Sequence, residues 1–177
     1  QRMLASTAEG TDAVQGNSFF EDPLPDNGSN ESFRTTIFGL LNVATAGNYQ
    51  FAVSSDDIGN LYLSSNENPA NKTRIACDPE WNGSRQYAAT DRRPGQGNIS
   101  AMQTLAAGNY YLEYTYAEGG GGNNGSAAWR PESGPAFTNG QEPIPASAFT
   151  PTRYFNGAER GEFFMNLGAV SIVSQAV

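Results

Sequence analysis

Apolar and polar residues alternate in several short stretches of the chain. A strand-like run over residues 33–43 is followed by a second run in which Tyr49, Phe51 and Val53 occupy every other position. This period of two is typical of a strand with one buried face. The residues between the two runs, Thr45-Ala46-Gly47-Asn48, favour a turn, so we expect the two runs to form a β-hairpin.

Further short strands are predicted at roughly even spacing. Tyrosine and leucine alternate with other residues over 110–116, and the remaining strand candidates are Leu61 and Leu63, Arg74 to Ala76, Ser126 to Trp129, and Gly168 to Val173. Segments rich in Gly, Pro and Asn separate them. This pattern predicts an all-β fold, an antiparallel sandwich or barrel-like structure with long loops and little helix.

The two ends of the chain differ from the middle. We predict an irregular N-terminal segment over 1–32, with one short strand near Met3 to Ser6, a core over 33–150 and a strand-like tail over 151–177. No stretch approaches the roughly twenty apolar residues of a membrane span, so no membrane insertion is expected. The chain opens at Gln1 without a leader pattern, and we expect a product whose targeting segment has been removed.

Composition narrows the function. The 177 residues fit one compact domain, and 18 acidic against 10 basic residues give a net charge of −8, which disfavours nucleic acid as a partner. The chain has no histidine and one cysteine, which excludes histidine-based catalytic triads and zinc clusters. We therefore expect no enzyme. Cys77 is predicted to be a buried small hydrophobe or an intermolecular partner.

Asp56 and Asp57 are the first candidate site. They follow a predicted strand and enter a loop, where adjacent carboxylates can turn toward one point and repel. A hard cation with oxygen ligands, such as Ca²⁺, relieves that repulsion. The alternative is that both are solvated turn residues or caps of nearby backbone N–H groups.

A glycine run over 119–122, followed by Asn123 and Asn124, is the second candidate. No Gly-Lys-Ser/Thr sequence follows it, so a phosphate-binding loop is not expected. The run would let backbone carbonyls and Asn amide oxygens approach an ion or a sugar. The alternative is a hairpin tip without a ligand.

Aromatic residues could provide a sugar-stacking platform. Trp81, in a predicted loop, is the strongest candidate for contact with a pyranose ring, whereas Trp129 and the alternating tyrosines are more typical of a half-buried core. The chain also has enough acids for a glycosidase-type carboxylate pair, but no such pair is indicated by the sequence.

Several sequence motifs, in order along the chain, resemble those of the PA14 domain as it occurs in large bacterial extracellular proteins. The resemblance runs from about Phe33 to Phe149. Its phrases are GNYQF (47–51), VSSDD (53–57), LYLSSNENPANK (61–72), LAAGNYY (105–111) and EGGGGNN through AW (118–129). The resemblance implies a β-sandwich of PA14 type.

The resemblance also implies calcium-dependent carbohydrate binding, as in many members. Asp56 and Asp57 match the family's aspartate pair, which is joined by a cis peptide bond, and Asn124 matches the loop asparagine. Main-chain oxygens near Ser126 are expected to complete the shell. The expected sugar contacts are Asp56, Asp57, Asn123, Asn124 and Trp81. Where the family usually has Asp, this chain has Asn123, so one carboxylate is missing.

The predicted function is therefore a secreted or cell-surface module that recognises glycans through a loop-bound Ca²⁺. The residues outside the resemblance support an alternative. The family's opening strand is faint in residues 1–20 and the tail is strand-like, so neighbouring subunits could associate by strand addition through residues 1–30 and 151–177. Such a subunit would build an extracellular filament, sheath or surface layer.

Overall fold

The computed structural model describes residues 18–22, 32–88 and 96–150, and the backbone of three strands beyond them. Those three strands are β9 (Arg153–Phe155), β10 (Phe164–Asn166) and β11 (Val170–Ala176). The strand predicted near Met3 to Ser6 lies outside the described residues.

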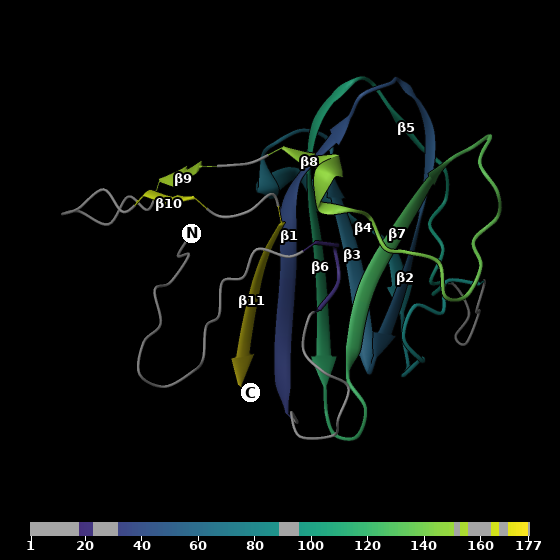
Figure 1. The fold of residues 1–177 in the computed structure, drawn as a ribbon, viewed down its shortest axis with the longest axis vertical. Helices are drawn as coiled ribbons and strands as arrows, with labels where there is room; N and C mark the ends of the chain where they lie inside the picture. Colours follow the sequence, from purple (N-terminus) through teal and green to yellow (C-terminus); the bar gives the residue numbers. More distant parts are fainter. Residues whose placement is uncertain are drawn as a thin grey trace.

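Two antiparallel sheets pack face to face (Figure 1). The larger, six-stranded sheet has the order β11-β1-β6-β3-β4, with β8 also paired to β1. Its other strands are β1 (Phe33–Val43), β3 (Ile58–Ser64), β4 (Lys72–Asp78), β6 (Gly108–Glu118) and β8 (Phe149–Thr150). The smaller sheet has the order β5-β2-β7, formed by β5 (Gln103–Leu105), β2 (Gly47–Asp56) and β7 (Asn124–Pro131).

The all-β antiparallel sandwich predicted from the sequence is confirmed. Within the described residues, helical structure is limited to two 3₁₀ turns, η1 (Pro69–Asn71) and η2 (Ala146–Ala148). None of the helices in this part of the chain has the length and hydropathy needed to cross a membrane.

The predicted hairpin between the first two strands is wrong. β1 pairs with β6, β8 and β11, whereas β2 pairs with β5 and β7 in the opposite sheet. Both strands have an apolar face, and Ile37 and Phe51 are both fully buried in the same core. The turn between the strands therefore carries the chain across the core, so that each strand covers it from a different side.

The core fills the space between the sheets. Tyr114 and Tyr116 of β6 point into it and are almost fully buried, as are Phe51 and Val53 of β2. These tyrosines are core residues rather than a stacking platform. Cys77 is likewise buried, which agrees with the prediction of a small buried hydrophobe.

A second apolar cluster covers the other face of the smaller sheet. It consists of Ala52, Ala128, Tyr87 and Phe137, with Ile99 packed against it. The smaller sheet is thus buried on both faces, and loops rather than a third sheet cover its outer face.

Residues 18–22 lie along the free edge of β7. The Asp22 amide donates to the Gly125 carbonyl at 2.7 Å, and the Ala127 amide donates to the Phe20 carbonyl at 3.1 Å. Phe20 is fully buried and stacks on Phe149 with ring centres 5.1 Å apart. This short segment is therefore part of the sandwich.

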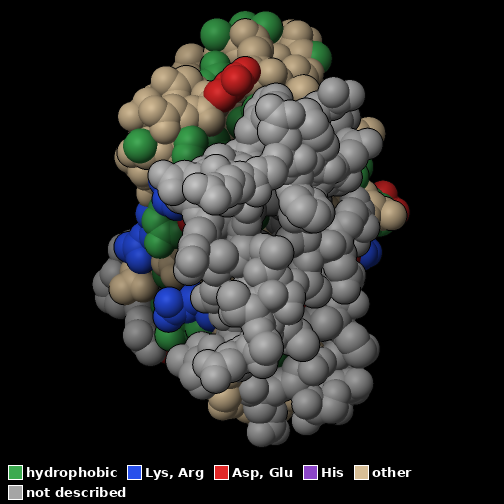
Figure 2. All heavy atoms as spheres, turned by 90° about the vertical axis from the view of Figure 1, so that its left-hand side faces the viewer, with side chains coloured by type: hydrophobic (Ala, Val, Ile, Leu, Met, Phe, Trp, Pro, Cys, Tyr) green, Lys and Arg blue, Asp and Glu red, His purple; other side chains and the backbone are tan. Residues whose placement is uncertain are grey.

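β11 lies along the outer edge of β1, in antiparallel register from Phe33↔Ala176 to Gly39↔Val170. β8 continues that edge at Leu40 and Leu41. On the side of the molecule where β11 lies, the described basic side chains gather at mid-height and an acidic side chain lies near the top (Figure 2). The described part of this face therefore carries both signs of charge.

Candidate functional site

The chain crosses from one sheet to the other at Asp57. β2 ends at Asp56 and β3 begins at Ile58, so Asp57 is the one residue between them. The Asp57 amide donates to the Ala117 carbonyl at 3.0 Å, and its Oδ2 accepts from the Gly119 amide at 3.0 Å. The peptide bond between Asp56 and Asp57 is cis, as the resemblance implies. The pair is thus held against the end of β6.

Asn124 lies directly across from Asp56. The two residues are partners in the β2·β7 ladder, and directly opposed residues of an antiparallel pair project from the same face. Asn124 Nδ2 donates to the Asn82 carbonyl at 2.9 Å, which fixes the orientation of the amide. Asn124 Oδ1 is buried and accepts no hydrogen bond from the described residues. A buried amide oxygen of this kind fits a cation ligand.

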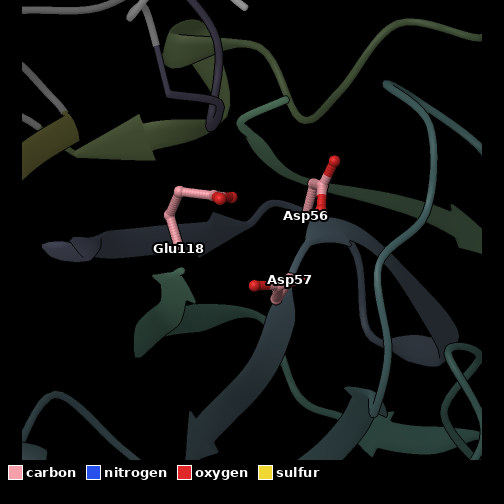
Figure 3. Close-up of side chains that lie close together, drawn as sticks. All are labelled: Asp56, Asp57 and Glu118. Atoms are coloured by element: carbon pink, nitrogen blue, oxygen red, sulfur yellow. The ribbon is translucent and has the colours of Figure 1, made fainter. Parts of the chain in front are cut away.

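Glu118 adds a third carboxylate, which was not predicted from the sequence. Carboxylate oxygens of Asp56, Asp57 and Glu118 all lie within 4.8 Å of one another. Figure 3 shows the Glu118 side chain extending from the end of β6 toward the space beside the two aspartates. Glu118 is only 3% exposed, whereas Asp56 and Asp57 are half-buried. Three negative charges so close together favour a bound cation.

A signal for Glu118 was present in the alternation of β6. Leu112, Tyr114 and Tyr116 occupy every second position and face the core, and Glu118 is the next position on that face. An acid at a core-facing position is uncommon unless it is paired or binds a metal.

Ser126 is placed differently from the three carboxylates. It lies two residues after Asn124 on the same face of β7, and its hydroxyl accepts a hydrogen bond from Tyr87 at 2.6 Å. Burial raises the pKa of the Tyr87 phenol above its ordinary value near 10, so that it stays a donor to Ser126 in alkaline as well as neutral solution. The expectation for Ser126 concerns its main-chain oxygen and stays a prediction.

Trp81 stands at the surface beside this site. It is 61% exposed and precedes Asn82, whose carbonyl holds Asn124 and whose amide donates to the Ser55 carbonyl at 2.7 Å. Asn123, in contrast, is only 2% exposed at the point where the chain enters β7. The exposed indole of Trp81 thus belongs to the residue before Asn82, whose carbonyl contacts Asn124, whereas Asn123 is buried.

Beneath the site, two tyrosines support the strand ends. A Cβ atom at Gly125 would overlap the ring of Tyr116, so this position of β7 requires glycine. The Tyr116 hydroxyl donates to Asp22, and burial together with the Asp22 charge raises the Tyr116 pKa. The Tyr114 hydroxyl donates to the Ser54 carbonyl at 3.0 Å. The Tyr114 phenol thus fixes the backbone two residues before Asp56, and the Tyr116 phenol holds the side chain of Asp22.

An ion pair joins the Trp81 loop, which we define as residues 79–88, to segment 18–22. Arg85 donates to both carboxylate oxygens of Glu21, from Nε at 2.8 Å and from Nη2 at 2.6 Å. The hydrogen bonds to Glu21 raise the pKa of the Arg85 guanidinium. Neither residue was singled out from the sequence.

Comparison with known proteins gives structural similarity only. No protein-family model and no curated protein matches the chain. Among solved structures it is similar to a PA14 sugar-binding domain from an RTX adhesin, with 21% identity, a TM-score of 0.41 and coverage of 60% of this chain and 50% of the other.

Two domains from Candida glabrata are also similar. One is the epithelial adhesin 9 A domain in complex with Galβ1-4GlcNAc, with 13% identity, a TM-score of 0.44 and coverage of 64% of this chain and 53% of the other. The second is the epithelial adhesin 6 A domain in complex with Galβ1-3GlcNAc, with 15% identity, a TM-score of 0.44 and coverage of 76% and 65%. The chain therefore spans between half and about two thirds of the length of these structures.

A PA14 domain is thus among the solved structures to which this chain is similar, as the sequence phrases predict. The donors at the site are carboxylate and amide oxygens, without nitrogen or sulfur ligands among the described residues that form it. Hard cations such as Ca²⁺ prefer such a set, and Ca²⁺ accepts the irregular geometry that strand ends and loops provide. The residues present therefore fit a calcium ion.

Proposed function

We propose that the chain is a non-enzymatic glycan-binding module with a calcium site at the β2–β3 crossing. Asp56, Asp57 and Glu118 would hold the ion through their carboxylates, and Asn124 through Oδ1. The observation that carries this proposal is the convergence of the three carboxylates next to a buried amide oxygen whose own NH₂ group is already engaged. Main-chain oxygens near Ser126 would complete the shell.

The sugar would bind at the exposed side of this cluster. A bound calcium ion supplies coordination positions that neighbouring sugar hydroxyls can fill. Asp56 and Asp57 are half-buried, so their carboxylates can also accept hydrogen bonds from those hydroxyls. Trp81 offers an exposed aromatic face in the adjoining loop, and pyranose C–H groups pack on such faces. Asn123 and Asn124 would border the same place, and the module would act outside the cell, secreted or at the cell surface.

Calcium titration of the full chain by calorimetry, together with a glycan array, tests this function. We expect one calcium ion per chain, and glycan binding that disappears with a chelator and returns with Ca²⁺ but not with the smaller Mg²⁺. A chain that binds no Ca²⁺, or that binds glycans equally well with and without chelator, would contradict the proposal.

Strand addition between subunits is a second candidate function. It is favoured by the pairing of β11 with the outer edge of β1, because that contact is a main-chain ladder that any extended segment of suitable sequence could form. A β11 donated by a neighbouring copy would join subunits into an extracellular filament, sheath or surface layer.

Sedimentation of the full chain over a wide concentration range, with and without residues 151–177, tests that candidate. We expect assemblies of the full chain and monomers of the shortened one. A full chain that remains monomeric at every concentration would exclude strand exchange as its function.

A further inference from the structure

The Glu21–Arg85 ion pair joins two irregular segments, residues 18–22 and the Trp81 loop. Its two parallel hydrogen bonds, at 2.8 and 2.6 Å, have the bidentate geometry that makes arginine–carboxylate pairs directional. The Arg85 guanidinium also lies 5.6 Å from the centre of the Phe19 ring. Arg85 therefore contacts the 18–22 segment at two residues, Phe19 and Glu21.

The Glu21 side of the pair is tied to the strand that carries Asn124. Glu21 forms an antiparallel bridge with Ser126, and the next amide, that of Asp22, donates to the Gly125 carbonyl at 2.7 Å. Phe20 anchors the segment in the core. Segment 18–22 and the beginning of β7 thus form one packed unit.

The Arg85 side is tied to the loop that orients the Asn124 amide. Asn82, three residues before Arg85, accepts the hydrogen bond from Asn124 Nδ2. Arg85 itself has a φ of 53°, a left-handed conformation that is uncommon for residues other than glycine. Its carbonyl accepts from the Gly140 amide at 2.8 Å. The pair with Glu21 therefore holds the Trp81 loop at a residue with an unfavourable backbone conformation.

We propose that Glu21 and Arg85 are positioning residues for the calcium site, and this proposal rests on the proposed function. The ion pair holds the Trp81 loop against segment 18–22, and the loop in turn holds the Asn124 amide so that Oδ1 faces the carboxylates. Neither residue contacts the ion. Their contribution is to keep one ligand oriented before the ion binds, and so to raise calcium affinity.

The test compares three variants of the full chain, Arg85→Gln, Glu21→Gln and Arg85→Lys, with the unmodified chain. The first readout is the hydrogen-exchange rate of the Asn82 amide by NMR in the presence of chelator. The second is calcium affinity by calorimetry. We expect Arg85→Gln and Glu21→Gln to speed Asn82 exchange and to weaken calcium binding, each by about fivefold, the size of one well-aligned exposed ion pair. Arg85→Lys keeps the charge without the bidentate geometry and should lie between them and the unmodified chain.

A matched control is Lys72→Gln, which breaks a different ion pair, Lys72–Glu113, on the larger sheet. We expect it to lower the free energy of unfolding without changing either readout. If Arg85→Gln leaves Asn82 exchange at the rate of the unmodified chain, or changes it no more than Lys72→Gln does, the positioning role is wrong. An unmodified chain without calcium affinity would instead overturn the proposed function, and with it the role of the pair in ion binding, whatever the exchange rates.

Discussion

Two ion pairs among the described residues, Lys72–Glu113 and Arg85–Glu21, have nearly the same chemistry in very different surroundings. Lys72 and Glu113 approach to 2.6 Å with side chains 29% and 11% exposed, and Arg85 and Glu21 approach to 2.6 Å with side chains 31% and 20% exposed. Lys72 and Glu113 belong to β4 and β6 of the larger sheet, on either side of β3. Arg85 and Glu21 belong to a loop and a short terminal segment.

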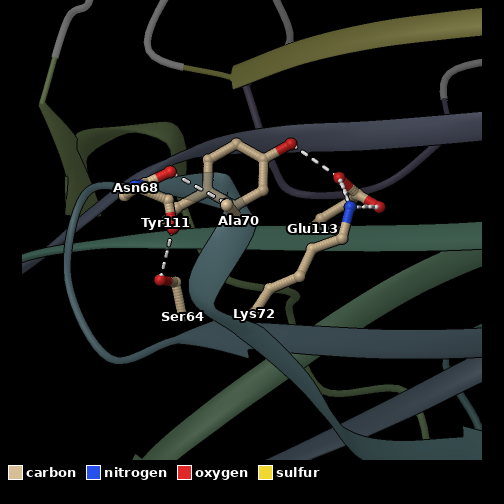
Figure 4. A network of polar contacts seen from close by, with 6 residues as sticks. All are labelled: Ser64, Asn68, Ala70, Lys72, Tyr111 and Glu113. Atoms are coloured by element: carbon tan, nitrogen blue, oxygen red, sulfur yellow. Dashed lines mark hydrogen bonds and ion pairs between the residues drawn. The ribbon is translucent and has the colours of Figure 1, made fainter.

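The neighbourhood of each pair explains what it can control. Figure 4 shows that Glu113 accepts hydrogen bonds from both Lys72 and Tyr111. The Lys72 ammonium also lies 5.7 Å from the ring centre of Tyr62 on β3. Backbone hydrogen bonds between β4, β3 and β6 already fix where Lys72 and Glu113 lie, so this ion pair adds stability without determining the position of either strand. The Arg85–Glu21 pair instead joins segments without a regular ladder, so it can determine where a loop lies.

The largest effect should come from alkaline pH, which acts on buried tyrosines at the site end of the sandwich. Burial raises the pKa of Tyr87, Tyr114 and Tyr116. Their unfolded forms ionise near pH 10, so the contribution of these tyrosines to stability should be constant below that pH and fall above it, by about 1.4 kcal/mol per pH unit for each tyrosine. Urea unfolding at increasing pH measures the slope. Tyr87→Phe should reduce it by about a third, and an unchanged slope would show that Tyr87 ionises in the folded state.

Gly125→Ala should be the next most severe change. The new methyl group would overlap the Tyr116 ring beneath β7, and we expect a loss of about 3 kcal/mol in the free energy of unfolding. Gly47→Ala is the matched control, because its Cβ would meet only Tyr49, at 3.8 Å. Equal stability of the two variants in urea would mean that the packing under the site is looser than the structure indicates.

Asp56→Asn should separate ion binding from stability. The substitution keeps the shape of the side chain and removes one of three converging charges, so we expect calcium affinity to fall about a hundredfold, equivalent to about 2.7 kcal/mol. Without calcium the variant should be at least as stable as the unmodified chain, because like charges repel less. Glu67→Gln makes the same charge change in the turn that follows β3 and should bind Ca²⁺ normally. Calorimetry measures both affinities, and equal values would remove Asp56 from the site.

Glu113→Gln should affect the larger sheet alone. It leaves the Lys72 ammonium partly buried without its carboxylate, and we expect a loss of about 1.5 kcal/mol in the free energy of unfolding. Combining it with Lys72→Met should restore part of that loss, because no unpaired charge then remains. Calcium affinity should not change in either variant, and a change would show that the two ends of the sandwich are coupled.

Trp81→Ala should have the smallest effect on stability, within about 0.5 kcal/mol, because the side chain is mostly exposed. Its effect on glycan affinity should be larger, a loss of about threefold to tenfold, as for removal of one aromatic contact. Met102→Ala, another exposed apolar side chain, is the control. Unchanged glycan affinity in Trp81→Ala would exclude the indole from the sugar site.

Local alternation was enough to locate the longer strands but not to pair them. The alternating residues of β2 and β6 predict strands because period two and burial on one face are properties of short segments. The turn between β1 and β2 predicts a hairpin because turn residues show that the chain reverses, but they do not show in which sheet it continues. That choice depends on the shared core, to which both strands present an apolar face.

The candidate site could be inferred from the sequence only in the part that follows from sequence neighbours and from a family motif. Asp56 and Asn124 are brought together by the β2·β7 register, and Asp57 follows Asp56 directly in the sequence. Glu118 and the pair of Glu21 with Arg85, 64 residues apart, were missed because these contacts arise when distant segments pack on the same strand ends. Even so, the position of Glu118 on the core-facing side of β6 was readable from the alternation.

The burial of Asn82 and Asn98 bears on how the protein can be produced. Both begin Asn-x-Ser sequences, the acceptor pattern for N-linked glycosylation in eukaryotic secretory pathways. Yet each is only 1% exposed, and each uses its side-chain amide inside the fold, Asn82 toward Asp78 and Asn98 toward the Val53 carbonyl. A glycan attached to either nitrogen before folding could not fit there, whereas Asn71, which begins an Asn-x-Thr sequence in an exposed turn, could carry one. We therefore expect a eukaryotic host that glycosylates secreted proteins to misfold the chains in which Asn82 or Asn98 carries a glycan. A host without N-linked glycosylation would avoid this cause of misfolding.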